Sequence, residues 1–447
     1  MSSAITKVDA SQIFDSRGNP TVQVDLYAEH GKFTAMVPSG ASTSSYEACE
    51  LRDGDKTKYG GKGVFKAVNN VRTVLGPELV SSRLSPTSQS EIDAFLRKLD
   101  GTPNKSKLGA NAILGVSMAV ARAGAAASNI PLYDHLANLF GAKPDREYVM
   151  PVPFFNVLNG GVHSGNTLAP QEFMIAPVGA TSFEEAMQLG TECYHQLKSL
   201  IAEKYGKAGT GIGDEGGFAP PISTFEEAFD LLTAAVERAG HTGRVKFGID
   251  PASSEFYSTE TSKYNLGFKA EVKKEGQIQS SAQMIKLYSS LLKKYPIVLL
   301  EDPFAEDDWP AWTEFCKLEG GRVELVGDDL LSTNVERIKT AVEKKACNSL
   351  LLKVNQIGTV TESLDAAHLA HSSHWSTFVS HRSGETTDSF IADLVVALGN
   401  GHLKSGAPAR GERVAKYNRL LEIERELKQS GKRVRYAGEG FRTAWGQ

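Results

Sequence analysis

The feature that most constrains the fold is a series of short apolar runs between residues 295 and 404, each of which ends in a polar residue. These ends are Glu301, Asp328, Lys353, His381 and Lys404. The runs are rich in branched side chains and are separated by helix-length amphipathic segments, a pattern typical of a parallel sheet with helical crossovers. If the strands close into a barrel, all these polar ends lie at one rim, where barrel enzymes carry their catalytic residues.

A chain of 447 residues is too long for one ordinary domain. We expect an α/β protein with an N-terminal α+β domain over residues 1–140 and a TIM-like (β/α)8 barrel over residues 141–447. In the first domain, alternating runs at 8–14, 21–27 and 32–37 predict an antiparallel sheet, and the apolar segment 109–127 predicts a buried helix.

The barrel is predicted to start irregularly. The runs at 152–158 and 172–175 are too close for a helical crossover, so we expect them to form an antiparallel pair. Two helices should follow, starting at capping boxes formed by Thr181 with Glu184 and by Ser223 with Glu226.

Composition argues against several classes of partner. A net charge of −4 gives no basic field for nucleic acid. There is no run of roughly 18 uncharged apolar residues, so no membrane partner is expected, and the N-terminus lacks the apolar core of a signal peptide. The four cysteines are scattered, which favours reduced packing residues. We therefore expect a cytoplasmic protein.

Three acids end three successive predicted strands: Asp250, Glu301 and Asp328. Barrel closure would bring these carboxylates together, and hard oxygen donors without His or thiolate suit Mg²⁺. A single carboxylate at a strand end is more often a helix cap or a surface charge. Caps alone would not select acids on three consecutive strands.

Cations follow neighbouring strands in the same ring. Lys353 can act as a base if a nearby cation destabilises its ammonium, and a base beside a metal points to proton abstraction α to a carboxylate. The alternative is a structural lysine paired with one acid. Arg382 beside Ser383 could hold a phosphate, or form an ion pair with Glu385, and Lys404 adds a cation for an anionic substrate.

With these motifs the chain resembles the enolases, of the eukaryotic type, over essentially its whole length. The runs that carry the resemblance occur in one order: SRGNPTV at 16–22, PSGAST at 38–43, NKSKLGANAILGVS at 104–117, QEFMI at 171–175, GDEGGFAP at 213–220, EDPF at 301–304, GDDL at 327–330, LLKVNQIG at 351–358 and SHRSGET at 380–386. The resemblance implies a homodimeric, Mg²⁺-dependent hydro-lyase that interconverts 2-phosphoglycerate and phosphoenolpyruvate in glycolysis and gluconeogenesis.

The resemblance also implies roles for the reacting groups. It places the first Mg²⁺ on the acidic trio, and the second, which enters with substrate, on Ser39 when its loop closes. Lys353 would take the C2 proton. Glu215, supported by Glu172, would protonate the departing C3 hydroxide.

Substrate contacts are implied in the same way. Lys404 and the first metal would hold the substrate carboxylate, and Arg382 and Ser383 the phosphate. His163 and His381 would line the closed pocket.

Every presumed catalytic and metal position is retained, but several neighbours depart from the pattern we associate with enolases. They are Ser44, Val162, Pro170, Pro251, Ser405 and Gly411. These changes bear on loop motion rather than on reaction type, because Ser stiffens a position that Gly would loosen and Pro fixes the backbone. Two alternatives are an enzyme of the same fold acting on a related phosphonate and a catalytically idle structural protein.

Overall fold

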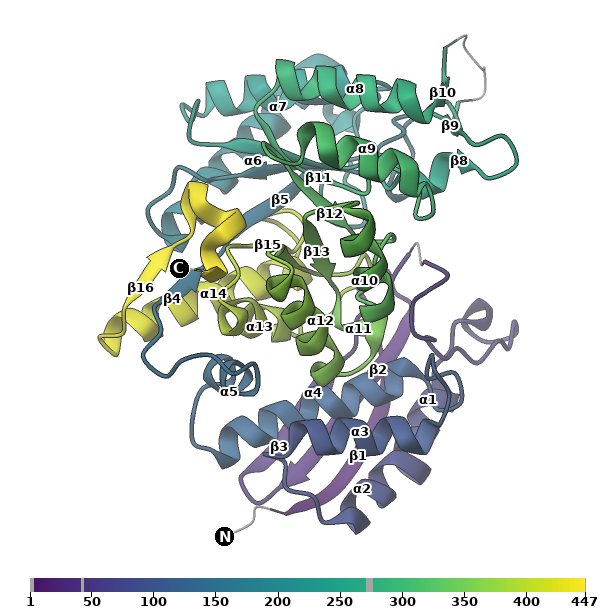
Figure 1. Cartoon of the computed structure of the whole chain (residues 1–447), viewed down its shortest axis with the longest axis vertical. Helices are drawn as coiled ribbons and strands as arrows, with labels where there is room; N and C mark the ends of the chain where they lie inside the picture. Colours follow the sequence, from purple (N-terminus) through teal and green to yellow (C-terminus); the bar gives the residue numbers. More distant parts are fainter. Residues whose placement is uncertain (1–3, 42–43, 271–275, 447) are drawn as a thin grey trace.

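The N-terminal unit is built on a three-stranded antiparallel sheet. The structure is a computed structural model that describes residues 4–41, 44–270 and 276–446. Strands β1 (Ile5–Phe14), β2 (Pro20–Ala28) and β3 (Gly31–Met36) pair in sequence order, as predicted. In Figure 1 this sheet lies at the end of the molecule away from β8–β10.

Helices cover the sheet and connect it to the rest of the chain. They are α1 (Phe65–Asn70), α2 (Gly76–Ser82), α3 (Gln89–Asp100), α4 (Ala110–Ala127) and α5 (Leu132–Leu139). The predicted buried helix is α4, which packs on β2 and β3 with Gly115 facing Val24. By length and composition α4 could cross a membrane, but 83% of it is buried inside the protein, as in the core helix of a domain.

The second unit is a closed eight-stranded barrel, which confirms the predicted fold class. Around the barrel its strands are β11 (Ile297–Glu301), β12 (Glu324–Gly327), β13 (Ser349–Leu352), β14 (Ser376–Ser380), β15 (His402–Lys404), β5 (Val152–Asn159), β6 (Glu172–Ala176) and β7 (Lys246–Asp250). Leu299, Val326, Leu351 and Phe378 belong to the buried cluster that fills the interior. Since this filling is apolar, polar chemistry is confined to the ends of the barrel.

One strand, β6, runs against both of its neighbours. The predicted antiparallel pair of β5 and β6 is present, and β6 is also antiparallel to β7, which was not predicted. Its first residue, Glu172, is therefore in register with Asp250, the last residue of β7. The reversal brings the start of β6 to the rim where the other strands end.

Helices surround the barrel (Figure 1). They are α6 (Phe183–Tyr205), α7 (Phe225–Arg238), α8 (Ser281–Lys294), α9 (Trp309–Glu319), α10 (Val335–Lys344), α11 (Val354–Ile357), α12 (Val360–Ser372), α13 (Phe390–Leu398) and α14 (Gly411–Gln429). The predicted caps of α6 and α7 are wrong by one residue. Ser182 and Thr224 accept from the backbone N–H groups of Glu185 and Glu227, because a cap bonds the third helical residue.

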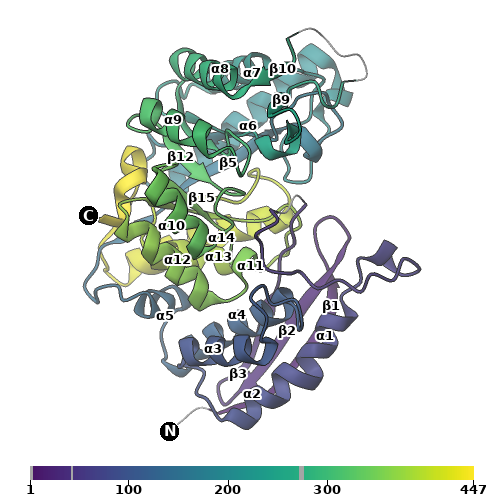
Figure 2. The ribbon, with the colours of Figure 1, turned by 45° about the vertical axis from the view of Figure 1, so that its right-hand side comes forward.

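Two small sheets complete the fold. Strands β8 (Tyr257–Ser258), β9 (Lys263–Asn265) and β10 (Ile278–Ser280) form an antiparallel insertion between β7 and α8, which was not predicted. Strand β4 (Tyr148–Met150) pairs with β16 (Val434–Tyr436). In Figure 2 the segment after β3 extends from the N-terminal unit toward the barrel. Two residues of the loop that was expected to bring Ser39 to a metal, Ser42 and Thr43, lie outside the described residues.

Candidate active site

A narrow cavity lined mostly by buried polar side chains lies at the predicted rim. Ten of the twelve predicted site residues are on its wall: His163, Glu172, Glu215, Asp250, Asp328, Lys353, His381, Arg382, Ser383 and Lys404. Glu301 is fully buried and reaches the site through Lys404. Ser39 is not on the wall. Its hydroxyl donates to Glu50 at 3.1 Å and accepts from Arg52 at 2.9 Å.

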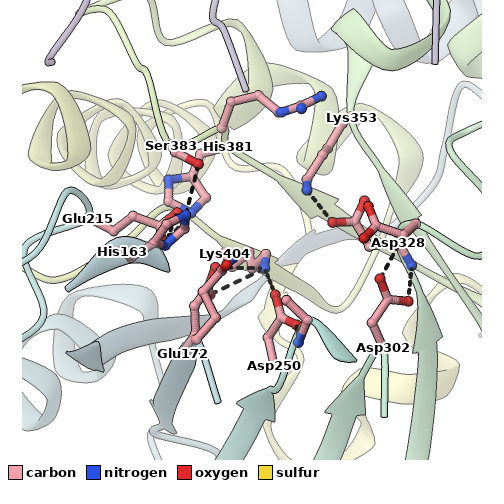
Figure 3. Close-up of a pocket in the computed structure, with 14 residues that line it drawn as sticks. His163, Glu172, Glu215, Asp250, Asp302, Asp328, Lys353, His381, Ser383 and Lys404 are labelled. Atoms are coloured by element: carbon pink, nitrogen blue, oxygen red, sulfur yellow. Dashed lines mark hydrogen bonds and ion pairs between the residues drawn. The ribbon is translucent and has the colours of Figure 1, made fainter. Parts of the chain in front are cut away.

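Lys404 is at the centre of the site (Figure 3). Its ammonium contacts Glu301 at 2.7 Å, Glu172 at 3.2 Å and Asp250 at 3.4 Å. Burial would lower the pKa of Lys404, but these carboxylates raise it well above its usual value. Lys404 is therefore a permanent cation in this structure.

Lys353 contacts the third acid of the trio. Its ammonium forms an ion pair with Asp328, whose other oxygen accepts from Gln356 at 2.8 Å. Burial would lower the pKa of Lys353, but the Asp328 carboxylate raises it. The three predicted metal ligands thus share one rim, and each carboxylate pairs with an ammonium. These ammonium groups offset the repulsion between the carboxylates.

Two further acids belong to the site but were not predicted. Asp302 and Asp329 line the cavity, and carboxylate oxygens of Asp302, Asp328 and Asp329 lie within 4.8 Å of one another. Asp302 also accepts from the backbone N–H groups of Asp328 and Asp329, at 2.9 and 2.7 Å. The signal was in the sequence, because each missed acid directly follows a predicted ligand.

The chemistry of this donor set fits a divalent cation. Burial, followed by repulsion from neighbouring acids, raises the pKa of Glu301, Asp302 and Asp329 well above their usual values. Oε2 of Glu301 is buried and has no hydrogen-bond partner among the residues that the structure describes. Hard oxygen donors with a surplus of negative charge suit Mg²⁺.

A second carboxyl pair lies across the cavity from Lys353 (Figure 3). Ligand atoms of Glu172, Glu215 and His163 lie within 4.8 Å of one another. Burial and the charge of Glu215 raise the pKa of Glu172 well above its usual range. Burial would also raise the pKa of Glu215, but His381, His163 and Arg413 hold it well below. These opposite shifts mean that Glu172 holds a proton more readily than Glu215 does.

His381 is held in one tautomer. Burial lowers its pKa to about 3, so the ring is neutral at pH 7. Arg413 donates to Nδ1 at 2.5 Å. Since that nitrogen accepts, the ring proton is on Nε2, which lies 3.4 Å from Glu215.

Arg382 is paired with a residue of the N-terminal unit. Its two terminal nitrogens donate to Glu47 at 3.0 and 3.2 Å, and one also donates to Asn355 at 3.1 Å. The alternative partner considered from sequence, Glu385, instead pairs with Lys416 at 2.8 Å. Beside Arg382, Ser383 lies 3.3 Å from Nε2 of His163.

Comparison with protein-family models gives two matches that together span most of the chain. The model of the N-terminal domain of enolase matches residues 5–136. The model of the C-terminal TIM barrel domain of enolase matches residues 147–445.

Proposed function

The chain belongs to the enolase family and is thus a lyase-type enzyme of the enolase superfamily; we propose that it catalyses the reversible dehydration of 2-phosphoglycerate to phosphoenolpyruvate. One observation carries this proposal. An amine, Lys353, and a carboxyl pair, Glu172 with Glu215, face each other across one buried cavity (Figure 3). Removing a proton from one carbon and hydroxide from the next needs a base and an acid, and these two groups could serve opposite faces of the substrate.

Lys353 is the proposed base for the C2 proton. It is 12% exposed and its ammonium is paired with Asp328. The ammonium has to lose a proton before the neutral amine can take one from C2, and a divalent cation bound to Asp328 would favour that loss by weakening the pair. Removing the proton next to a carboxylate builds a second negative charge, which Lys404 lies in position to offset.

Glu215 is the proposed acid for the C3 hydroxyl. Asn156 donates to its Oε2 at 2.9 Å, which orients the carboxyl group. Glu172, whose pKa is raised, is the proposed source of the proton that Glu215 delivers to the departing oxygen. His163 and His381 border this side and exclude water when substrate is bound.

Arg382 and Ser383 are the proposed phosphate contacts, because a guanidinium beside a hydroxyl can bind phosphate by several charge-assisted hydrogen bonds. Lys404 would meet the substrate carboxylate. Side chains from two neighbouring strand ends, those of β14 and β15, would thus fix both ends of a small anion that carries a carboxylate and a phosphate.

Two Mg²⁺ ions are part of the proposal. Asp250, Glu301 and Asp328 would hold the first. The surplus of buried carboxylates supports this assignment, as does the Glu301 oxygen that has no hydrogen-bond partner within the described part of the chain. Ser39 would hold the second once its loop approaches the cavity. Bound there, Mg²⁺ would stabilise negative charge that develops on the substrate carboxylate.

We also propose that this enolase is of the eukaryotic type, that it is cytoplasmic and that it forms a homodimer. Phe14 and Tyr59 are 56% and 47% exposed, and their rings contact each other 6.0 Å apart, which gives the N-terminal unit an apolar surface suited to a second copy. All four cysteines are free, as is usual in a reducing compartment.

The test is Mg²⁺-dependent formation of phosphoenolpyruvate from 2-phosphoglycerate, followed by ultraviolet absorbance. Lys353→Ala should lower kcat by at least about 10²–10⁴-fold, because it removes the general base. The matched control is Lys339→Ala, which removes a surface lysine that is 54% exposed and should leave the rate unchanged. Wild-type protein that does not convert 2-phosphoglycerate would contradict the proposal.

A further inference from the structure

A lysine outside the cavity contacts the segment that carries His163. Lys269 lies in the turn after β9, and its ammonium donates to the backbone carbonyls of Gly161 and of Ser164, the latter at 2.8 Å. These two carbonyls flank His163 in the chain. Among the residues that the structure describes, Lys269 forms no ion pair with a carboxylate, so its charge is directed at this segment.

The turn that presents Lys269 is itself fixed. The N–H of Gly267 donates to the Asn265 side chain at 3.0 Å, and the N–H of Phe268 donates to the Asn265 carbonyl at 3.1 Å. The Phe268 ring stacks 5.9 Å from Phe256. The ammonium therefore extends from an anchored turn.

The segment that it contacts also has hydrogen bonds of its own: the N–H of Gly161 donates to the Leu168 carbonyl at 2.9 Å, and the N–H of His163 donates to the Gly160 carbonyl at 3.1 Å. Val162 is 50% exposed, whereas the His163 side chain is buried and lies against Ser383 and Glu215. Asn166 ties the far end of the segment to the carbonyls of Asn159 and Pro220, at 3.0 and 3.1 Å. Lys269, which lies outside the cavity, thus binds the backbone on both sides of His163.

We propose that Lys269 is a positioning residue, which holds residues 161–164 by two charge-assisted hydrogen bonds and thereby keeps His163 against the cavity. Methionine has a similar length but no N–H group to donate to these carbonyls, so it cannot replace the lysine. This role rests on the proposed function only where it concerns turnover. The two hydrogen bonds from Lys269 exist without substrate.

Amide hydrogen exchange of the substrate-free protein tests directly whether these two hydrogen bonds hold residues 161–164. In Lys269→Met, amides of residues 160–166 should exchange about tenfold faster or more, the change expected from losing hydrogen bonds to a charged group. Lys269→Arg should restore most of the protection, and Lys263→Met, at an exposed position on neighbouring β9, should leave it unchanged. Unchanged exchange in α4 shows that each variant is folded.

Turnover supplies the second readout. Lys269→Met should lower kcat about tenfold, while the inhibition constant for inorganic phosphate stays within about twofold, because Arg382 and Ser383 are untouched. Wild-type exchange of residues 160–166 in Lys269→Met would overturn the proposal. If wild-type protein fails to convert 2-phosphoglycerate but exchange in Lys269→Met is faster as expected, the proposed function fails, whereas the positioning role of Lys269 is supported.

Discussion

At the scale of single residues, the site is defined by carboxylates that outnumber their cations. Glu301 is fully buried, one of its oxygens pairs with Lys404, and the other has no hydrogen-bond partner among the described residues. A buried carboxylate oxygen without a partner is costly unless a cation or a proton compensates it. The surplus negative charge that destabilises the metal-free fold is the same charge that would bind Mg²⁺.

Mg²⁺ should therefore stabilise the folded protein without any substrate. At about 100 times its dissociation constant, Mg²⁺ should add about 2.7 kcal/mol to the free energy of unfolding, seen as a higher melting temperature. Glu301→Gln should lose most of this increment.

The control is Glu324→Gln, which changes another fully buried carboxylate. Glu324 begins β12 and pairs with His402 at 2.9 Å, at the end of the strand away from the cavity. Its variant should have a different starting stability but the same increment. An increment that survives in Glu301→Gln would show that the ion binds elsewhere.

At the scale of elements, the barrel positions its rim through close contacts between helices and strands. Gly190 in α6 faces Phe155 of β5, and a Cβ atom at this glycine would lie 2.2 Å from the ring. The ring is fully buried and also contacts Tyr417 at 5.0 Å, so it has little room to move. A side chain at position 190 would push α6 away from the strand that leads into the His163 segment.

Gly190→Ala should destabilise the protein by about 1–3 kcal/mol, the usual cost of overpacking, despite the better helix propensity of alanine. The measurement is the midpoint of urea unfolding. Gly411→Ala is the matched control, because Gly411 begins α14 and a Cβ there would meet no atom within 4 Å. Equal stability of the two variants would show that the α6–β5 contact is not tight.

At the scale of the whole molecule, local patterns predicted the architecture and long-range contacts decided the rest. The acids at the ends of β7, β11 and β12 were found because strand ends follow from apolar runs. The second antiparallel partner of β6, the pairing of Arg382 with Glu47 and the reach of Lys269 to Gly161 all join segments far apart in sequence. No local pattern reports such contacts. Asp302 and Asp329 were missed although their neighbours were chosen, because either acid of each pair could face the cavity.

The junction of the two units should make stability depend on pH. His135 lies in α5, which packs on both α4 and the barrel helix α13. Burial lowers its pKa from 6.5 to about 4, so the folded protein keeps the ring neutral. Between about pH 6.5 and 4 the unfolded chain binds a proton that the folded chain does not, so stability falls as the pH falls.

His135→Gln should remove about 2–3 kcal/mol of the stability difference between pH 7 and pH 4.5, measured from urea unfolding at both values. His30→Gln, at an exposed histidine, should behave as wild type. A His135→Gln variant with the full acid sensitivity of wild type would place the acid-labile group elsewhere.

The most direct test of the two-sided mechanism separates its two proton transfers. In heavy water, exchange of the C2 proton of 2-phosphoglycerate, followed by NMR, reports the base alone, whereas phosphoenolpyruvate formation needs the acid as well. Glu215→Gln should still exchange the C2 proton but form almost no product, and Lys353→Ala should be at least about 10²-fold slower in both. Exchange by Lys353→Ala at the rate of Glu215→Gln would contradict the assignment of Lys353 as the base.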